Sequence, residues 1–264
     1  MSKFYTQIAF FLLSISLYVN NKTLAADPAP IKAASPKLTC HRPTPEEIYE
    51  KNKHLLCTDP EEIKEAEKYM NEAVKRLEDH AISKDGYMFL GKRSNMFLYR
   101  KKHEGRTNVE KIIYSVDDPN KYNGIINEIW DPDHDSPFNN GSVKIARVYN
   151  PNLVMIQQRY EKDFWGRQKY FYALATKVEI SKDITIIAMA SGNINDHHPS
   201  KKEYKNPIIG EKNLFKTDIN SDDDIQKGKL RKTFVNIAGY LIKKKYDSYI
   251  DITFVGSING HSCI

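Results

Sequence analysis

The sequence lacks most of the features that identify common functional classes. Its 264 residues include three cysteines, Cys40, Cys57 and Cys263, whose spacing contains no zinc-binding pattern. It has no Gly-x-Ser-x-Gly elbow, no phosphate-binding loop and no dinucleotide-binding fingerprint. We recognise no set of acid, base and nucleophile either. These absences argue against an enzyme, so we expect no catalytic residue and no cofactor.

The chain also lacks a large excess of charge of one sign. The chain has 40 basic and 34 acidic residues, a formal net charge of +6, and no basic patch with interleaved aromatic residues. This excess is too small to predict a nucleic-acid partner. The run Lys243-Lys244-Lys245 lies at an expected hairpin turn, where it is typical of a solvated surface or of weak contact with anionic lipid headgroups.

One apolar run is present, from Ile8 to Val19, after Lys3 and before the small residues that end at Ala25. It is shorter than the roughly 20 residues of a membrane-spanning helix. We therefore predict a signal peptide over residues 1–25, cleaved near Ala25, and a secreted protein. A flexible leader rich in proline, alanine and lysine is expected over residues 26–43, followed by one domain over residues 44–264.

The cysteines leave two alternatives open for a secreted chain. Cys40 and Cys57 could form a disulfide that fixes the N-terminal segment, with Cys263 left over near the end of the chain. The other alternative is three unpaired thiols.

Capping signals predict three helices. Thr44-Pro45-Glu46-Glu47 and Thr58-Asp59-Pro60-Glu61 each combine an N-cap residue, a proline and a nearby glutamate. After the second signal, apolar residues recur at helical spacing to about His80, which predicts an amphipathic helix. Asp118-Pro119 opens another helix, which Pro132 ends.

Alternating apolar residues predict a series of antiparallel strands. The expected strands cover residues 87–90, 96–101, 109–116, 143–149, 153–160, 168–180, 184–192, 233–242 and 249–255. The polar segment 193–229 is expected to be loop with one extra strand or a short helix. Helices combined with many antiparallel strands indicate an α+β domain.

The hairpin of residues 168–192 is the centre of this prediction. A three-residue turn would pair Ile180 with Ile184 and Val178 with Ile186, which gives one apolar face and one mixed face open to solvent over part of its length. Small residues, Ala188 and Ala190 among them, lie on the apolar face. We expect whatever covers that face to leave room beneath it.

Polar residues on otherwise apolar strand faces are candidates for ligand binding. Arg147 is expected to share its strand face with Ile145 and Tyr149. Gln157 and Arg159 share a face of the following strand. An arginine inside a cavity can hold a phosphate through charge-assisted hydrogen bonds. The alternative is that these faces point outward, with the arginine stems along the sheet.

Acidic and histidine clusters do not predict a metal site. The stretch from Asp218 to Lys229 begins like a calcium loop, but Asp223 replaces the required glycine and Lys229 replaces the bidentate glutamate. The clusters at residues 131–135 and 196–198 are typical of solvated loops, so we expect no metal.

Five stretches of the sequence resemble the fam-a proteins of malaria parasites. They are Tyr18–Ala25, Pro45–Cys57, Val148–Tyr160, Gly166–Ala173 and Phe234–Ile242. The resemblance spans nearly the whole chain. It implies a StAR-related lipid-transfer (START) domain, in which a curved antiparallel sheet and a long C-terminal helix enclose one lipid in a helix-grip fold.

The resemblance also implies a function. Members are secreted and associated with the transfer of phospholipid, especially phosphatidylcholine, so we expect a monomer that binds such a lipid during transient membrane contact. The expected compartments are the parasitophorous vacuole and the host red cell. The alternative is a secreted host-interaction or surface protein that retains the fold with little or no lipid transfer. The lipid-binding residues that we expect are Arg147, Tyr149, Gln157, Arg159, Tyr170, Tyr172, Leu174, Ala188 and Ala190.

Two roles within this set follow from the chemistry of a phosphocholine headgroup. We expect Arg147 or Arg159 to meet the phosphate, and a tyrosine to border the quaternary ammonium group. A START domain ends in a long lid helix, whereas three residues follow His261 here. We therefore expect a C-terminally truncated domain whose apolar face at Leu174 and Ile186 stays partly uncovered, unless the N-terminal helices replace the lid.

Overall fold

The computed structural model describes residues 43–103, 105, 107–134, 141–162, 166–200, 204–210, 215–246 and 248–259. The predicted signal peptide, nearly all of the leader, Cys40 and Cys263 lie outside these residues. The structure therefore does not test the choice between a Cys40–Cys57 disulfide and unpaired thiols. Within the described residues, no helix is both long and apolar enough to span a membrane.

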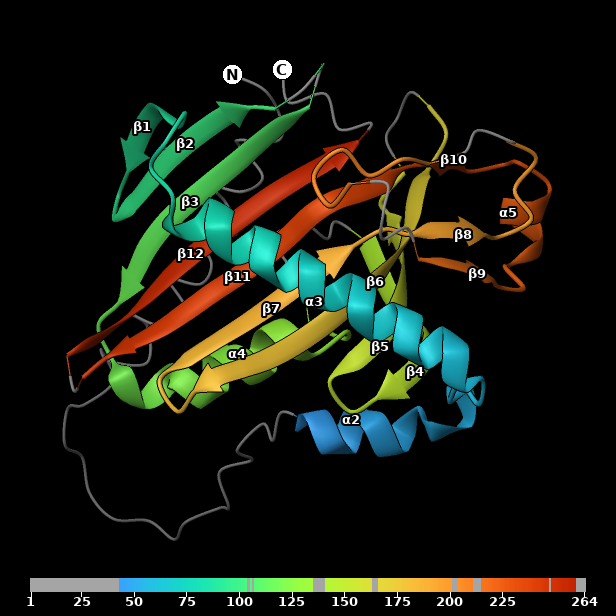
Figure 1. The fold of residues 1–264 in the computed structure, drawn as a ribbon, viewed down its shortest axis with the longest axis horizontal. Coiled ribbons are helices and arrows are strands. Elements are labelled where there is room, and N and C mark those ends of the chain that lie inside the picture. The colour runs from blue at the N-terminus through green and yellow to red at the C-terminus, as the bar shows by residue number, and fades with distance from the viewer. Residues whose placement is uncertain are drawn as a thin grey trace, which may run out of the picture.

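The fold is α+β, as predicted, with one large sheet (Figure 1). Nine antiparallel strands follow the order β1-β2-β3-β12-β11-β7-β6-β5-β4, and β10 adds a short parallel pairing to β6. The strands are β1 (Met88–Arg93), β2 (Met96–Lys102), β3 (Asn108–Val116), β4 (Gly141–Asn150), β5 (Leu153–Tyr160), β6 (Lys169–Ser181), β7 (Ile184–Ala190), β10 (Arg231–Lys232), β11 (Phe234–Lys245) and β12 (Tyr249–Asn259).

The polar segment after β7 contains both kinds of element that were expected there. A separate two-stranded parallel sheet pairs β8 (Asn193–Asn195) with β9 (Lys216–Asp218), and the short helix α5 (Asp223–Gln226) follows. The other helices are α2 (Pro45–Lys51), α3 (Pro60–Ile82) and α4 (Tyr122–Trp130), with the 3-10 turns η1 (Lys53–Leu55) and η2 (Pro119–Lys121).

Both predicted N-caps are present. The Thr44 hydroxyl accepts a hydrogen bond from the Glu47 amide while the Glu47 carboxylate accepts one from the Thr44 amide, a complete capping box. The Asp59 carboxylate accepts bonds from the first-turn amides of α3. These side chains satisfy amides that have no partner within the helix, so the local sequence determines where each helix begins.

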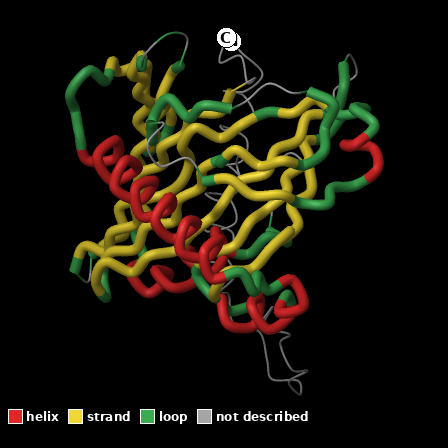
Figure 2. Tube along the Cα trace, turned by 45° about the vertical axis from the view of Figure 1, so that its right-hand side comes forward, coloured by secondary structure: helices red, strands yellow, loops and turns green. Residues whose placement is uncertain are grey.

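Helix α3 covers one face of the sheet (Figures 1 and 2). Its 23 residues span about 34 Å. The side chains at helical spacing are buried against β6, β7, β11 and β12, as the apolar stripe predicted. Leu77 lies at the closest approach, beside Gly239 of β11. We call this side of the sheet the α3 face.

The opposite side, the α4 face, is also apolar. Its buried cluster contains Tyr114, Tyr240 and Phe254 from the central strands and Trp130 from α4. The mixed face of the hairpin was expected to see solvent over part of its length, and it does so near the turn, where Glu179 is exposed and Lys177 is half-buried. Ala173 and Ile187, farther from the turn, are buried because this face is shared with apolar residues of six neighbouring strands.

The central hairpin keeps most of its predicted register. Val178 pairs with Ile186, as predicted, but Ile184 pairs with Ser181 instead of Ile180. A bulge between Glu179 and Ser181 accounts for the difference. Ile180 is consequently half exposed, because the extra residue turns it away from the ladder.

The C-terminal end of α3 is held by a buried lysine. The Lys111 ammonium of β3 donates hydrogen bonds to the carbonyls of His80 and Ser83 and lies 3.8 Å from the centre of the Tyr87 ring. Burial lowers the pKa of Lys111 to about 8. A cation at this position stabilises the helix because the last carbonyls carry partial negative charge.

We predict that Gly239→Ala strongly destabilises the fold. A Cβ at this position would lie 2.0 Å from the Ile187 carbonyl oxygen and 2.6 Å from Leu77 Cδ1. The expected loss in the free energy of unfolding, measured by urea denaturation, is about 2–4 kcal/mol.

Gly91→Ala is the matched control for this variant. Gly91 has a similar φ of +156°, against +150° for Gly239, but nothing lies within 4 Å of its added Cβ. The two variants therefore share the backbone cost and differ in the clashes with the Ile187 carbonyl of β7 and with Leu77 of α3. Equal losses for both would contradict close packing at Gly239.

A second prediction concerns pH. Burial, with contributions from Lys101 and His103, lowers the pKa of His80 to about 4. Below about pH 6.5 the unfolded chain binds a proton that folded His80 does not, so this residue removes stability as the pH falls from 6.5 toward 4. We expect a loss of about 1–2 kcal/mol between about pH 7 and pH 5 in urea denaturation.

His80→Gln should remove that part of the pH dependence. Glutamine can still bond the Tyr87 hydroxyl, which lies 2.9 Å from His80 Nδ1, but it does not titrate. The same loss between the two pH values in the variant would show that His80 is not responsible.

Candidate functional site

The nine predicted ligand residues all lie on the α3 face of β4, β5, β6 and β7. Tyr149, Tyr170 and Tyr172 belong to the buried cluster beneath α3. Cross-strand pairing places Arg159 opposite Tyr170 and Gln157 opposite Tyr172. Strand alternation therefore identified side chains that share a face, and the outward-facing alternative was wrong.

The apolar members of the set are fully packed. Leu174, Ala188 and Ala190 each have no exposed surface. We expected the small residues of this face to leave space beneath whatever covers it. At two glycines that space is filled, by Leu77 beside Gly239 and by Phe215 beside Gly192. The apolar face that was expected to stay partly uncovered is thus buried by α3. The sequence left this case open, in which an N-terminal helix covers the face.

One polar cluster joins the start of α3 to β4. The Glu62 carboxylate accepts hydrogen bonds from Arg147 Nη1 at 2.6 Å and from the Tyr149 hydroxyl at 2.7 Å. Arg147 also donates to the Thr217 hydroxyl and to the Asp218 carbonyl. Burial, reinforced by the Glu62 carboxylate, raises the pKa of Tyr149 well above its usual value. This tyrosine therefore stays neutral and acts as a donor.

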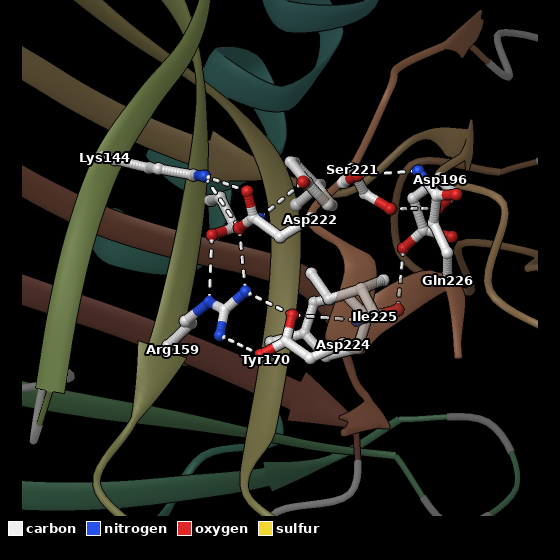
Figure 3. Close-up of polar contacts among 11 residues, drawn as sticks. Lys144, Arg159, Tyr170, Asp196, Ser221, Asp222, Asp224, Ile225 and Gln226 are labelled. Atoms are coloured by element: carbon white, nitrogen blue, oxygen red, sulfur yellow. Dashed lines mark hydrogen bonds and ion pairs between the residues drawn. The ribbon is translucent and has the colours of Figure 1, made fainter. Parts of the chain in front are cut away.

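A second cluster binds the loop around α5 to β4 and β5 (Figure 3). Arg159 donates to both carboxylate oxygens of Asp224, at 2.6 and 2.8 Å, and to Asp222 at 2.7 Å. Lys144 donates to both oxygens of Asp222, at 2.8 and 2.9 Å. Gln157 contacts Asp222 as well and donates to the Tyr172 hydroxyl.

Both aspartates of this cluster are held ionised. The hydrogen bond from Lys144 contributes most to lowering the pKa of Asp222, and the hydrogen bond from Arg159 contributes most to lowering that of Asp224. Because the carboxylates are stabilised in their charged form, two cations and two anions face each other. The cluster has no net positive charge to offer a ligand.

A third cluster lies deeper. The Tyr170 hydroxyl donates to Asp196 at 2.8 Å, and Lys232 donates to the other oxygen of the same carboxylate at 2.7 Å. The Asp196 side chain is 2% exposed. Among the described residues, no group of three or more His, Cys, Asp or Glu side chains could hold a metal ion.

Sequence reasoning missed the acidic partners in all three clusters. Glu62 was not singled out, and Asp222 was considered only as part of a calcium loop. Asp196 was assigned to a solvated loop. Pairing across 26 to 87 residues leaves no local signal, although a polar side chain on an apolar strand face does require a partner or a ligand.

This arrangement changes what the two arginines can do. Both guanidinium groups that were predicted to meet a phosphate already hold carboxylates of the same chain. A phosphate could reach Arg159 only if Asp222 and Asp224 moved away, because like charges would otherwise face each other. The ion pairs of Arg147 and Arg159 therefore have a structural role: they hold the segment from β9 to α5 against the sheet.

The described part of the α4 face carries an ion pair between strands β2 and β3, Arg100 with Glu110 at 3.1 Å, beside its buried hydrophobic cluster. The strand residues of that cluster are apolar, and aromatic side chains lie near its centre, where the Tyr240 and Phe254 rings are 5.4 Å apart. The helices that contribute to it within the described residues are α4, with nine residues, and α2, with Ile48.

Comparison with known proteins gives similarity to solved structures only. No family profile and no curated protein sequence matches the chain. Human STARD10 is similar over 72% of this chain and 68% of its own, with 13% identity and a TM-score of 0.48.

Two further human structures show the same degree of likeness. For StAR-related lipid transfer protein 5 the coverage is 74% and 81%, the identity 10% and the TM-score 0.49. For the StarD13 (DLC2) lipid transfer and protein localization domain the coverage is 74% and 83%, the identity 13% and the TM-score 0.42. Nothing about the ligand of this chain follows from likeness at this level.

We predict that Arg159→Leu destabilises the chain and loosens the loop. Its side chain is 20% exposed, and its loss removes the ion pairs to Asp222 and Asp224, whose side chains are 44% and 35% exposed. Urea denaturation should show a loss of about 1–3 kcal/mol. Hydrogen exchange of the amides of residues 219–228 should become faster.

Lys144→Met is the control, because Lys144 pairs with the same aspartate but its side chain is 52% exposed. An exposed ion pair contributes little, so the expected loss is below about 1 kcal/mol. If Arg159→Leu lowers the free energy of unfolding no more than Lys144→Met does, the ion pairs of Arg159 do not hold this segment in place as described.

Proposed function

We propose that this chain is a non-enzymatic phospholipid carrier whose acyl chains lie against the α4 face of the sheet. The observation that carries this proposal is the contrast between the two faces. One is covered by a 23-residue helix and carries three ion-pair clusters, whereas the other is a buried aromatic and aliphatic cluster on which the described helices are short.

Dimensions make the contrast concrete. The α4-face cluster draws on the eight neighbouring strands from β2 to β4, which span about 34 Å at the usual strand spacing. Helix α4, with nine residues, is only about 14 Å long. An acyl chain suits such a surface, because each methylene transferred from water contributes about 0.8 kcal/mol.

The resemblance of the sequence to the fam-a proteins supports the same proposal. We extend it to phosphatidylcholine as the preferred lipid, to a monomeric carrier, and to secretion into the parasitophorous vacuole or the host red cell. The nine residues of the α3 face are an alternative lipid site. Either site requires its cover to move: α3 lies over Leu174, Ala188 and Ala190, which have no exposed surface, and the α4-face residues Tyr114, Tyr240 and Phe254 are only 4–8% exposed.

A photoactivatable phosphatidylcholine with a diazirine in one acyl chain distinguishes the two faces. We expect the purified chain to take up the probe with a stoichiometry near one lipid per chain and to transfer it between vesicles. Mass spectrometry should locate the cross-links on residues of the α4 face, such as Tyr114, Tyr240 and Phe254.

Strand alternation supplies an internal control in this experiment. Phe254 and Val255 are neighbours on β12 but belong to the clusters of opposite faces. Cross-links on Val255, Tyr172 or Leu174 would favour the α3 face. Failure to extract any lipid from the purified chain, together with no transfer, would overturn the carrier function itself.

A further inference from the structure

The sheet ends at an edge strand with an unusual surface. Strand β1 is the outermost strand at its end of the sheet (Figure 1). Three consecutive residues on it are exposed: Met88 by 62%, Phe89 by 54% and Leu90 by 39%. Phe97 of the adjacent strand is 37% exposed. Clustered large apolar side chains on a surface indicate an interaction site.

The exposed side chains belong to both faces of the hairpin formed by β1 and β2, residues 88–102, which we call the edge hairpin. Phe89 pairs with Tyr99, which pairs with Lys111, the residue that caps α3. Phe89 therefore lies on the α3 side of the sheet. Met88, its neighbour along the strand, lies on the opposite side by alternation.

Basic residues surround these apolar side chains. Residues 82–103 contain six lysines and arginines and one acidic residue, Asp85. Arg100 is paired with Glu110. Lys92 and Arg93 are exposed on β1, and the Lys92 ammonium lies 5.0 Å from the centre of the Phe97 ring. A long basic side chain along an apolar group can keep its charge at a headgroup while its stem enters an apolar layer.

We propose that the edge hairpin docks on the surface of a bilayer that contains anionic phospholipid. Its apolar side chains enter the boundary between headgroups and acyl chains, and Lys92 and Arg93 contact lipid phosphates. The two-sided exposure favours a bilayer over a folded protein partner, because a flat protein surface would cover only one side of the hairpin.

Pairing with a second copy of the edge is disfavoured by the strand itself. A bulge between Phe89 and Gly91 interrupts the register, and two consecutive basic residues end the strand. Bulges and charges on edge strands hinder association of one edge with another. The bilayer is therefore the occupant that fits both the charge and the shape of the site.

Sedimentation with vesicles tests this proposal. The purified chain is mixed with vesicles of phosphatidylcholine that contain phosphatidylserine, and with vesicles of phosphatidylcholine alone. We expect stronger binding to the anionic vesicles, and we expect salt to weaken it because screening shortens the reach of surface charges. Hydrogen exchange of residues 87–93 should slow on the anionic vesicles.

Two variants separate the contributions of the edge hairpin. The triple variant Met88→Ser, Phe89→Ser, Leu90→Ser should lower the partition coefficient at least about tenfold, because it removes the apolar anchor. Lys92→Gln with Arg93→Gln should lower it by about fivefold for each charge removed. All changed residues are exposed, and thermal unfolding checks that each variant stays folded.

Matched controls lie elsewhere on the surface. Ile180→Ser with Tyr249→Ser removes two other exposed apolar residues, and Lys244→Gln with Lys245→Gln removes charge from the other basic run. We expect the controls to bind within about twofold of the wild type.

Docking at the edge hairpin is overturned if the wild type does not prefer anionic vesicles, or if hairpin variants and controls bind alike. Binding of the hairpin to a protein without any vesicle binding would overturn it too. The inference does not rest on the carrier function. A chain that docks but yields no extractable lipid refutes only the carrier, and a chain that holds lipid but does not dock refutes only this site.

Discussion

The structure depends on the packing of α3 across the sheet. The helix is attached at four places along its length. Glu62 binds Arg147 near its start, the Tyr69 hydroxyl donates to the Ser191 carbonyl at 2.7 Å, Leu77 packs beside Gly239, and Lys111 caps its end. Because these contacts are spread along the length of the helix, displacing α3 would break polar and apolar contacts together.

This attachment determines what the rest of the molecule can do. On the α3 face, both arginines and all three predicted tyrosines have partners within the chain. They hold the segment from β8 to α5 against β4 and β5, and they give that face a structural role. We therefore propose ligand binding on the α4 face and membrane contact at the edge hairpin, which lie on different parts of the same sheet.

Much of this fold follows from local sequence signals. Capping residues at Thr44 and Asp59 locate two helices, and alternation along the strands locates the sheet and shows which residues share a face. Turns and bulges were less predictable. Ile180 was misplaced because a bulge costs only one residue and leaves no pattern in the sequence.

The site could be predicted only in part, for a physical reason. The nine residues do lie together, since alternation fixes the face of every strand residue. What covers a face is a tertiary property, however. The burial of this face by α3 depends on contacts such as Leu77 with Gly239, which no spacing reveals. The partners of the arginines were hidden for the same reason.

We propose that α3 stays in place while lipid binds on the α4 face. A covalent link between α3 and the sheet tests this most directly. Glu67 and Asn150 are hydrogen-bonded at 3.2 Å and join α3 to the end of β4. With the three native cysteines changed to serine, Glu67→Cys and Asn150→Cys can be joined by a short bis-maleimide. The account predicts that the linked chain captures phosphatidylcholine as well as the unlinked chain does. Loss of lipid capture on linking, with recovery when the link is omitted, would show that the lipid lies beneath α3 and would contradict it.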